Sequence, residues 1–210
     1  MAKATLTRKE REKLRHKEEI LSAALKLFSN KGFHNVSMQQ IAEESEFAVG
    51  TIYNFFENKE ALFEELTRNC GKRITNELIN ILKGPGNEVE RLTKFIRHAP
   101  KLLEENAEIV KLYVSELGAR GAKISKSRDK EDFHIILDSE LQKLLDDGIR
   151  KGLFRKVDPT IATLAINSTI QTLAFENAEH LNKAAVTETF EKVEQLFIDG
   201  LLLSEGQGNE

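Results

Sequence analysis

Residues 32–63 have the sequence GFHNVSMQQIAEESEFAVGTIYNFFENKEALF, and this stretch decides the fold. Ser37 is followed three residues later by Gln40, the reciprocal capping pattern that begins a helix. A second short helix is expected over about residues 48–55, where apolar residues recur at three- and four-residue spacing. Asn58 is a good N-cap for a longer helix. The stretch therefore predicts two short helices in succession.

Helical periodicity continues on both sides of this stretch. Upstream, apolar spacing predicts a helix over about residues 8–31 that ends in a left-handed cap at Gly32. Downstream, the helix that starts after Asn58 extends to about Lys83, and Gly84-Pro85-Gly86 then marks a hinge or boundary. Further helices are expected at about residues 88–104, 106–119, 129–151, 159–180 and 184–203. No strand alternation or repeat is visible, so the predicted fold is all-α.

Three local signals refine the C-terminal half. Pro100 should kink or end the helix that contains it, because proline lacks an N–H group and clashes with the preceding turn. The stretch Gly118–Arg128 has the small and charged composition of a loop. Asp158-Pro159 places a capping residue before a proline at the first helical position.

The composition is that of an ordinary globular protein, with 210 residues, a net charge of −3 and 40% hydrophobic residues. The single cysteine, Cys70, excludes an internal disulfide, and its place on an apolar stripe favours a small buried side chain. The five histidines form no metal-ligand spacing, so neither a metal nor another cofactor is expected. No membrane span or signal peptide is apparent, which favours a cytoplasmic protein without a membrane partner.

The charge is unevenly distributed along the chain. Residues 1–17 hold seven cations and two glutamates, a net +5 that leaves −8 for the remainder. Such a basic segment favours contact with nucleic acid, because lysine and arginine release counterions from phosphates. The alternative is a solvated helix start that serves only solubility.

Two short helices between longer ones predict a helix-turn-helix, whose second helix can lie in the major groove of DNA. Gly50 would let the backbone approach DNA, while Thr51, Tyr53 and Asn54 offer polar groups. Lys59 would meet a phosphate at a helix N-terminus. Alternatively, Tyr53 is a packing aromatic, and Asn54 and Lys59 are surface and capping residues.

The runs Gly32–Ala42 and Gly50–Phe63 resemble the TetR family of bacterial transcriptional regulators. The resemblance covers about residues 15–65, where glycine, Ser-Met, Ile-Ala, Gly-Thr-x-Tyr, Phe and Lys-Glu fall at the family spacing. A weaker echo, Gly148–Phe154 with Asp158-Pro159, resembles the turn between the seventh and eighth helices of many members.

This resemblance implies a homodimer that binds a palindromic operator in double-stranded DNA. It implies a DNA-binding domain over residues 1–57, a connecting helix over 58–83, and an effector-binding and dimerisation domain over 84–210. The candidate DNA-binding residues lie on the two short helices and at the start of the next: Ser37, Gln39, Val49, Gly50, Thr51, Tyr53, Asn54 and Lys59.

The sequence departs from the family pattern at three positions. Glu46 stands where the turn usually has glycine, so a residue with a side chain must adopt positive φ. Ala48 lacks a capping oxygen, which would weaken the start of the second short helix by ~1 kcal/mol. Val36 stands where a threonine is common, which removes one possible phosphate contact.

The last two helices are candidates for the dimer interface. The segment Thr160–Phe175 is apolar around most of its circumference and must be covered on all sides. Two copies of each helix would form a four-helix interface, although a larger single-chain core is the alternative. The candidate interface residues are Ile161, Leu164, Ile170, Phe190, Val193, Phe197 and Leu201.

Polar residues within apolar stretches, together with nearby phenylalanines, are candidates for an effector pocket. The apolar surroundings favour a small hydrophobic or amphipathic effector. The candidates are Phe95, His98, Tyr113, Phe133, His134, Asn167, Gln171 and Phe175.

The favoured function is a ligand-responsive repressor with no enzymatic activity. One alternative is a small enzyme that uses Cys70, His98 or the neighbouring carboxylates Glu104 and Glu105, but no catalytic motif supports it. The other alternative is an architectural DNA-binding protein without an effector.

Overall fold

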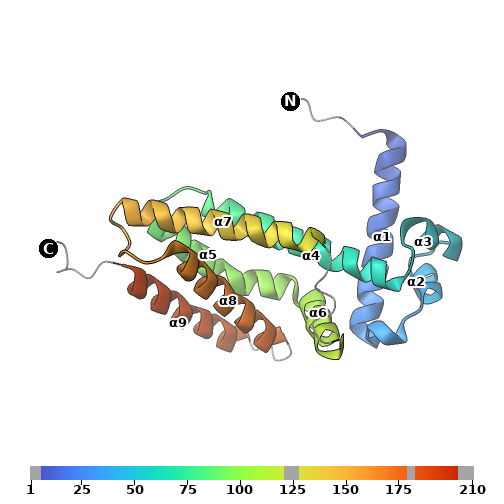
Figure 1. Cartoon of the computed structure of the whole chain (residues 1–210). Coiled ribbons are helices and arrows are strands. Elements are labelled where there is room, and N and C mark those ends of the chain that lie inside the picture. Colours follow the sequence, from blue (N-terminus) through green and yellow to red (C-terminus); the bar gives the residue numbers. More distant parts are fainter. Residues whose placement is uncertain (1–5, 121–127, 179–182, 203–210) are drawn as a thin grey trace. The chain divides into compact units, whose positions relative to one another are not determined.

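The computed structural model describes residues 6–120, 128–178 and 183–202 (Figure 1). The regular elements of these residues are helices joined by turns, with one isolated bridge between Phe154 and Leu202, so the predicted all-α fold is confirmed. The helices are α1 (Arg8–Lys31), η1 (Phe33–Asn35), α2 (Met38–Glu44), α3 (Val49–Phe55), α4 (Lys59–Leu82), α5 (Glu88–Glu105), α6 (Ala107–Arg120), α7 (Arg128–Arg150), α8 (Pro159–Ala178) and α9 (Lys183–Leu201). No helix within these residues is long and apolar enough to cross a bilayer.

The chain divides into two compact units, Met1–Asn69 and Cys70–Glu210. The division lies within α4 rather than at Gly84-Pro85-Gly86. Its physical reason is that Leu78 and Leu82, in the last part of α4, pack into the core of the second unit.

The core of the first unit is a cluster of three phenylalanines. Phe28, Phe33 and Phe63 are each 1% exposed, and the Phe33 ring centroid lies 5.2 Å from that of Phe28 and 5.1 Å from that of Phe63. These tilted and edge-to-face arrangements are the favourable geometry for aromatic pairs. Helices α2 and α3 each contribute one fully buried isoleucine to this unit, Ile41 and Ile52.

Gly32 ends α1 as predicted, but not with the expected left-handed cap. Its φ of 78° is positive while its ψ is 150°, so its backbone lies in an extended region that is open almost only to glycine. The Gly32 N–H still donates to the Phe28 carbonyl at 2.8 Å. The physical reason is that the chain must turn at once into η1, which places Phe33 in the core.

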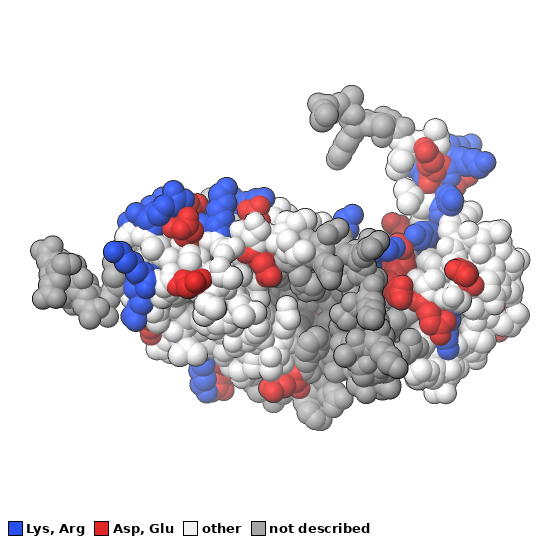
Figure 2. Space-filling model, viewed as in Figure 1, with Lys and Arg blue, Asp and Glu red and all other residues white. Residues whose placement is uncertain are grey.

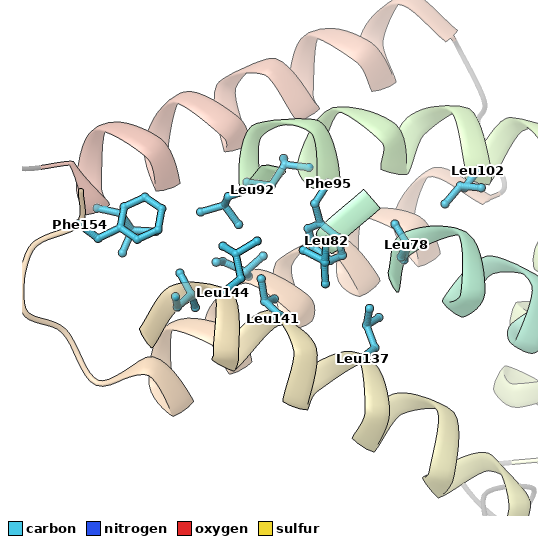
Figure 3. Close-up of a cluster of buried hydrophobic side chains, with 13 residues drawn as sticks. Leu78, Leu82, Leu92, Phe95, Leu102, Leu137, Leu141, Leu144 and Phe154 are labelled. Atoms are coloured by element: carbon cyan, nitrogen blue, oxygen red, sulfur yellow. The ribbon is translucent and has the colours of Figure 1, made fainter. Parts of the chain in front are cut away.

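The core of the second unit is rich in leucine and is contributed by α4, α5, α7, α8 and α9 (Figure 3). Phe154, which follows α7, closes one end of this core at 2% exposure. A Cβ atom on Gly148 would lie 2.2 Å from the Phe154 ring, so only glycine lets the turn after α7 close over this core.

A buried carboxylate joins the start of α5 to the end of α7. Glu88 is 2% exposed, and it accepts hydrogen bonds from Arg91 at 2.6 Å and from Lys151 at 2.8 Å. The Lys151 ammonium is the main cause that holds the pKa of Glu88 below its ordinary value. Arg91 also donates to the Leu82 carbonyl at 3.0 Å, so the same cluster holds the end of α4.

The structure differs from two expectations for the second unit. Helix α5 does not end at Pro100 but continues to Glu105, because Ala99 and Leu102 on either side are buried in the core and packing offsets the missing hydrogen bond. The expected loop over Gly118–Arg128 begins later, since α6 runs to Arg120. Ala119 and Arg120 are good helix formers, and residues 121–127 lie outside the described residues.

Candidate nucleic-acid interface

Helix α2 begins with the capping box that the sequence predicts. The Ser37 hydroxyl accepts a hydrogen bond from the Gln40 N–H at 3.2 Å, and the Gln40 side chain accepts from the Ser37 N–H at 2.9 Å. Ser37 and Gln39 are exposed, and the Gln39 amide donates to Glu43 at 3.1 Å. The helix is thus fixed at its N-terminus while two polar side chains remain accessible.

The turn between α2 and α3 shows the consequence of the Glu46 departure. Glu46 has a φ of 58°, the left-handed conformation that costs a residue with a side chain about 1–2 kcal/mol. Ala48 provides no side-chain cap for α3, as expected. Phe47 instead packs against His16 of α1, with ring centroids 5.0 Å apart, and this contact holds the turn.

Helix α3 has one buried and one exposed side. Ile52 is fully buried, whereas Tyr53 is 53% exposed, and Gly50 and Asn54 are exposed beside it. Val49 and Thr51 are half-buried at the edges. Gly50, Tyr53 and Asn54 therefore share the outward face, with the three- and four-residue spacing of neighbours on a helix surface.

Lys59 has a structural role that the sequence reasoning missed. Its ammonium donates to the carbonyls of Phe33 and Val36, each at 2.7 Å, and to that of His34 at 3.4 Å. It also lies 4.5 Å from the centroid of the Phe33 ring. A lysine has three N–H donors, so these contacts occupy the group that was expected to meet a phosphate. That phosphate contact stays a prediction.

The effector candidates whose side chains the structure describes have different surroundings. Phe95 belongs to the leucine-rich core, at 1% exposure, and its part in an effector pocket stays a prediction. Asn167 donates to Asp138 at 2.5 Å, His98 Nε2 lies 2.6 Å from a Glu77 oxygen, and Gln171 is exposed. The side chains of Tyr113, Phe133, His134 and Phe175 lie outside the described residues.

A groove of about 520 Å³ lies on the second unit, between the last part of α4 and α5. Of the effector candidates, it includes His98 alone. No cluster of three metal-binding side chains occurs within the described parts of the chain.

The candidate dimer residues separate into two groups. Ile161 and Leu164 on α8 are 63% and 62% exposed, and Ile170, Val193 and Phe197 are partly buried against the cores of the second unit. Phe190 and Leu201, at 2% and 6% exposure, are buried in those cores within a single chain. Leu196 on α9, which was not among the candidates, is 69% exposed. The dimer interface stays a prediction.

Cys70 lies half-buried near the joint between α5 and α6. Its thiol donates to the Asn106 side chain at 3.4 Å, and burial raises the pKa of the thiol. A raised pKa lowers the fraction of reactive thiolate at neutral pH, which argues against Cys70 as a nucleophile.

These features define a DNA-binding protein of the helix-turn-helix class, with a separate helical unit after it. Family models agree with this. The model described as "Bacterial regulatory proteins, tetR family" matches residues 20–66, and the "Tetracyclin repressor-like, C-terminal domain" model matches residues 89–196. The chain therefore belongs to the TetR family of transcriptional regulators.

Individual relatives show the same similarity. The HTH-type transcriptional regulator YhgD of Bacillus subtilis is 26% identical over 170 residues, which are 76% of this chain and 83% of that protein. YxaF of the same organism is 30% identical over 111 residues, 52% of this chain and 58% of that protein. The structure of B. subtilis FadR in complex with stearoyl-CoA has a TM-score of 0.73 at 22% identity, covering 87% of this chain and 98% of that one.

The carbonyl contacts of Lys59 predict a loss of stability on substitution. Lys59→Met keeps the aliphatic stem and removes the donors, so the free energy of unfolding should fall by about 2 kcal/mol. Thermal unfolding followed by circular dichroism measures this change, with Lys31→Met on the exposed end of α1 as the control. An unchanged melting temperature combined with weaker DNA binding would instead favour the phosphate contact.

Proposed function

We propose that this DNA-binding regulator is a repressor that a small hydrophobic or amphipathic effector releases from a palindromic operator. The observation that carries the DNA-binding part is the exposure of Tyr53 at the centre of α3, directly beside the fully buried Ile52. A large aromatic side chain on the outward face of a helix has the size and polar tip needed to contact base edges and phosphates. A Cβ atom added to Gly50, on the same face, would have no other atom within 4 Å. The backbone at Gly50 is therefore open to close approach.

Release by an effector requires a difference in affinity between two states of the protein. An effector that binds better to a form unable to bind DNA shifts the population away from the operator. Helix α4 is the natural element to carry this effect, since it begins in the first unit and ends in the core of the second. The cytoplasmic location and the absence of catalysis stay predictions.

The Tyr53 face predicts the outcome of a selection from random-sequence duplex DNA. The wild-type protein should enrich one palindromic family of duplexes, and Tyr53→Ala should bind it roughly 10- to 100-fold more weakly, the loss expected for one base contact. Fluorescence anisotropy measures the affinity, and Tyr53→Phe tests whether the ring or the hydroxyl matters. Equal affinity for the enriched and random duplexes would favour the architectural alternative.

The effector class can be tested with stearoyl-CoA, the ligand present in the B. subtilis FadR structure. This long-chain thioester should release the enriched duplex, whereas coenzyme A without the acyl chain should not, because the apolar chain would provide most of the binding energy. Titration of the protein–DNA complex measures the release. Retention of DNA at saturating stearoyl-CoA would exclude long-chain acyl thioesters as effectors.

The exposed apolar side chains of α8 and α9 support the homodimer. Ile161, Leu164 and Leu196 are each more than 60% exposed, and such side chains at helical spacing favour burial against a second copy. Ile161→Glu combined with Leu196→Glu should therefore give a monomer by light scattering. Ile135→Glu, on α7 and also 60% exposed, should leave the dimer intact. A dimer that persists in the double variant would exclude this face.

A further inference from the structure

Helix α1 is much longer than the core of its unit requires. Its first buried residue is Ile20, and residues 8–15 are all exposed. Figure 1 shows these N-terminal turns continuing past α3. A capping box between Thr7 and Glu10 stabilises the start of the helix, and the Glu10 pKa is lowered mainly by the hydrogen bond from the Thr7 backbone. The first turns of α1 are thus helical, and their side chains are exposed on every side.

Contacts of His16 and Lys17 define which face of α1 is turned toward α3. The His16 ring packs against Phe47, which lies just before α3. The Lys17 ammonium lies 5.6 Å from the ring of Phe56, which lies just after α3, and 2.9 Å from Glu65. The side of α1 between His16 and Lys17 therefore faces both ends of α3.

Two lysines continue this face toward the N-terminus. Lys9 and Lys13 precede Lys17 at successive four-residue spacings, which place side chains in one row along a helix. With a rise of ~1.5 Å per residue, Lys13 lies about 6 Å and Lys9 about 12 Å beyond Lys17 along the axis. Both are exposed, and neither forms an ion pair with any residue that the structure describes.

The opposite face of the same turns carries three arginines. Arg8, Arg11 and Arg15 follow one another at three- and four-residue spacing. Arg8 pairs with Glu12 at 3.1 Å, and Arg15 lies 3.8 Å from Glu19. Figure 2 shows the resulting mixture of basic and acidic side chains around the end of α1. The two faces carry similar numbers of cations, but the ion pairs with Glu12 and Glu19 are formed by the arginines.

The helix-turn-helix itself offers little positive charge. Between residues 37 and 60 the only lysine or arginine is Lys59, against five glutamates. The Lys59 ammonium is held by backbone carbonyls, and Lys26 of α1 pairs with Glu44 at 2.5 Å. The cations that neutralise DNA phosphates beside α3 must therefore come from another part of the unit. Lys9 and Lys13 are candidates, because they lie on the side of α1 that faces α3.

We infer that Lys9 and Lys13 bind backbone phosphates of the DNA duplex next to the groove that α3 enters, while the arginine face of α1 does not contact DNA. This inference rests on the proposed function and adds a second, sequence-independent contact to it. Phosphate contacts set the register and most of the salt dependence of binding, whereas base contacts set the sequence preference. The two parts of the unit therefore make separable contributions.

The experiment compares two double variants that remove the same charge from opposite faces. Lys9→Gln with Lys13→Gln is the test, and Arg8→Gln with Arg11→Gln is the matched control. The probe is a labelled mixed-sequence duplex of about 40 base pairs, titrated by fluorescence anisotropy between about 50 and 200 mM salt. The lysine variant should bind roughly 10- to 100-fold more weakly at low salt and lose about two units of salt slope per bound copy, while the arginine variant stays close to wild type.

Two results would overturn the inference. An equal loss in both double variants would show that α1 acts through its general charge, and an unchanged slope in the lysine variant would show that these residues do not contact phosphates. Tyr53→Ala separates this outcome from a failure of the proposed function, since it should weaken binding to the enriched duplex while leaving the salt slope of the mixed duplex unchanged. Circular dichroism confirms that α1 stays helical in each variant.

Discussion

The ammonium of Lys59 lies at the start of α4 and binds the backbone carbonyls of Phe33 and Val36, in the segment that joins α1 to α2. This interaction fixes the position at which α2 begins, while Phe33 on the same segment packs in the phenylalanine core. Helix α3 has only Ile52 fully buried, so its orientation depends on how firmly α2 and its flanking turns are held. The outward position of Tyr53 on α3 therefore depends on the contacts that hold α2 and its flanking turns.

Sequence patterns were sufficient for most helices because capping and periodicity are local signals. Ser37 with Gln40 and Asp158 before Pro159 place their caps within three residues, and both caps form in the structure. Helix α5 was harder, because the cost of Pro100 is local while the compensation comes from packing against other helices. Local rules fail where tertiary contacts outweigh them.

The sequence predicted the exposed residues of the candidate site better than the contacts that hold the site in place. Helical spacing places Tyr53 and Asn54 on one face, whereas the carbonyl partners of Lys59 lie more than twenty residues away and leave no mark in the sequence. The same limit applies to Phe190 and Leu201, which are buried within the single chain, since periodicity shows that a helix has an apolar face but not whether its own chain or a second copy covers it.

The contact between Gly148 and Phe154 has a consequence for how the family motif at this turn can vary. Since any Cβ atom at position 148 would overlap the Phe154 ring, the two positions form one unit of sequence variation. A gene that drifts from glycine to alanine here would need a smaller residue at 154 at the same time, and the leucine-rich core would then lose its closing ring. Positions 148 and 154 can therefore change only together, and each change at this turn is also a change in how the core of the second unit is closed.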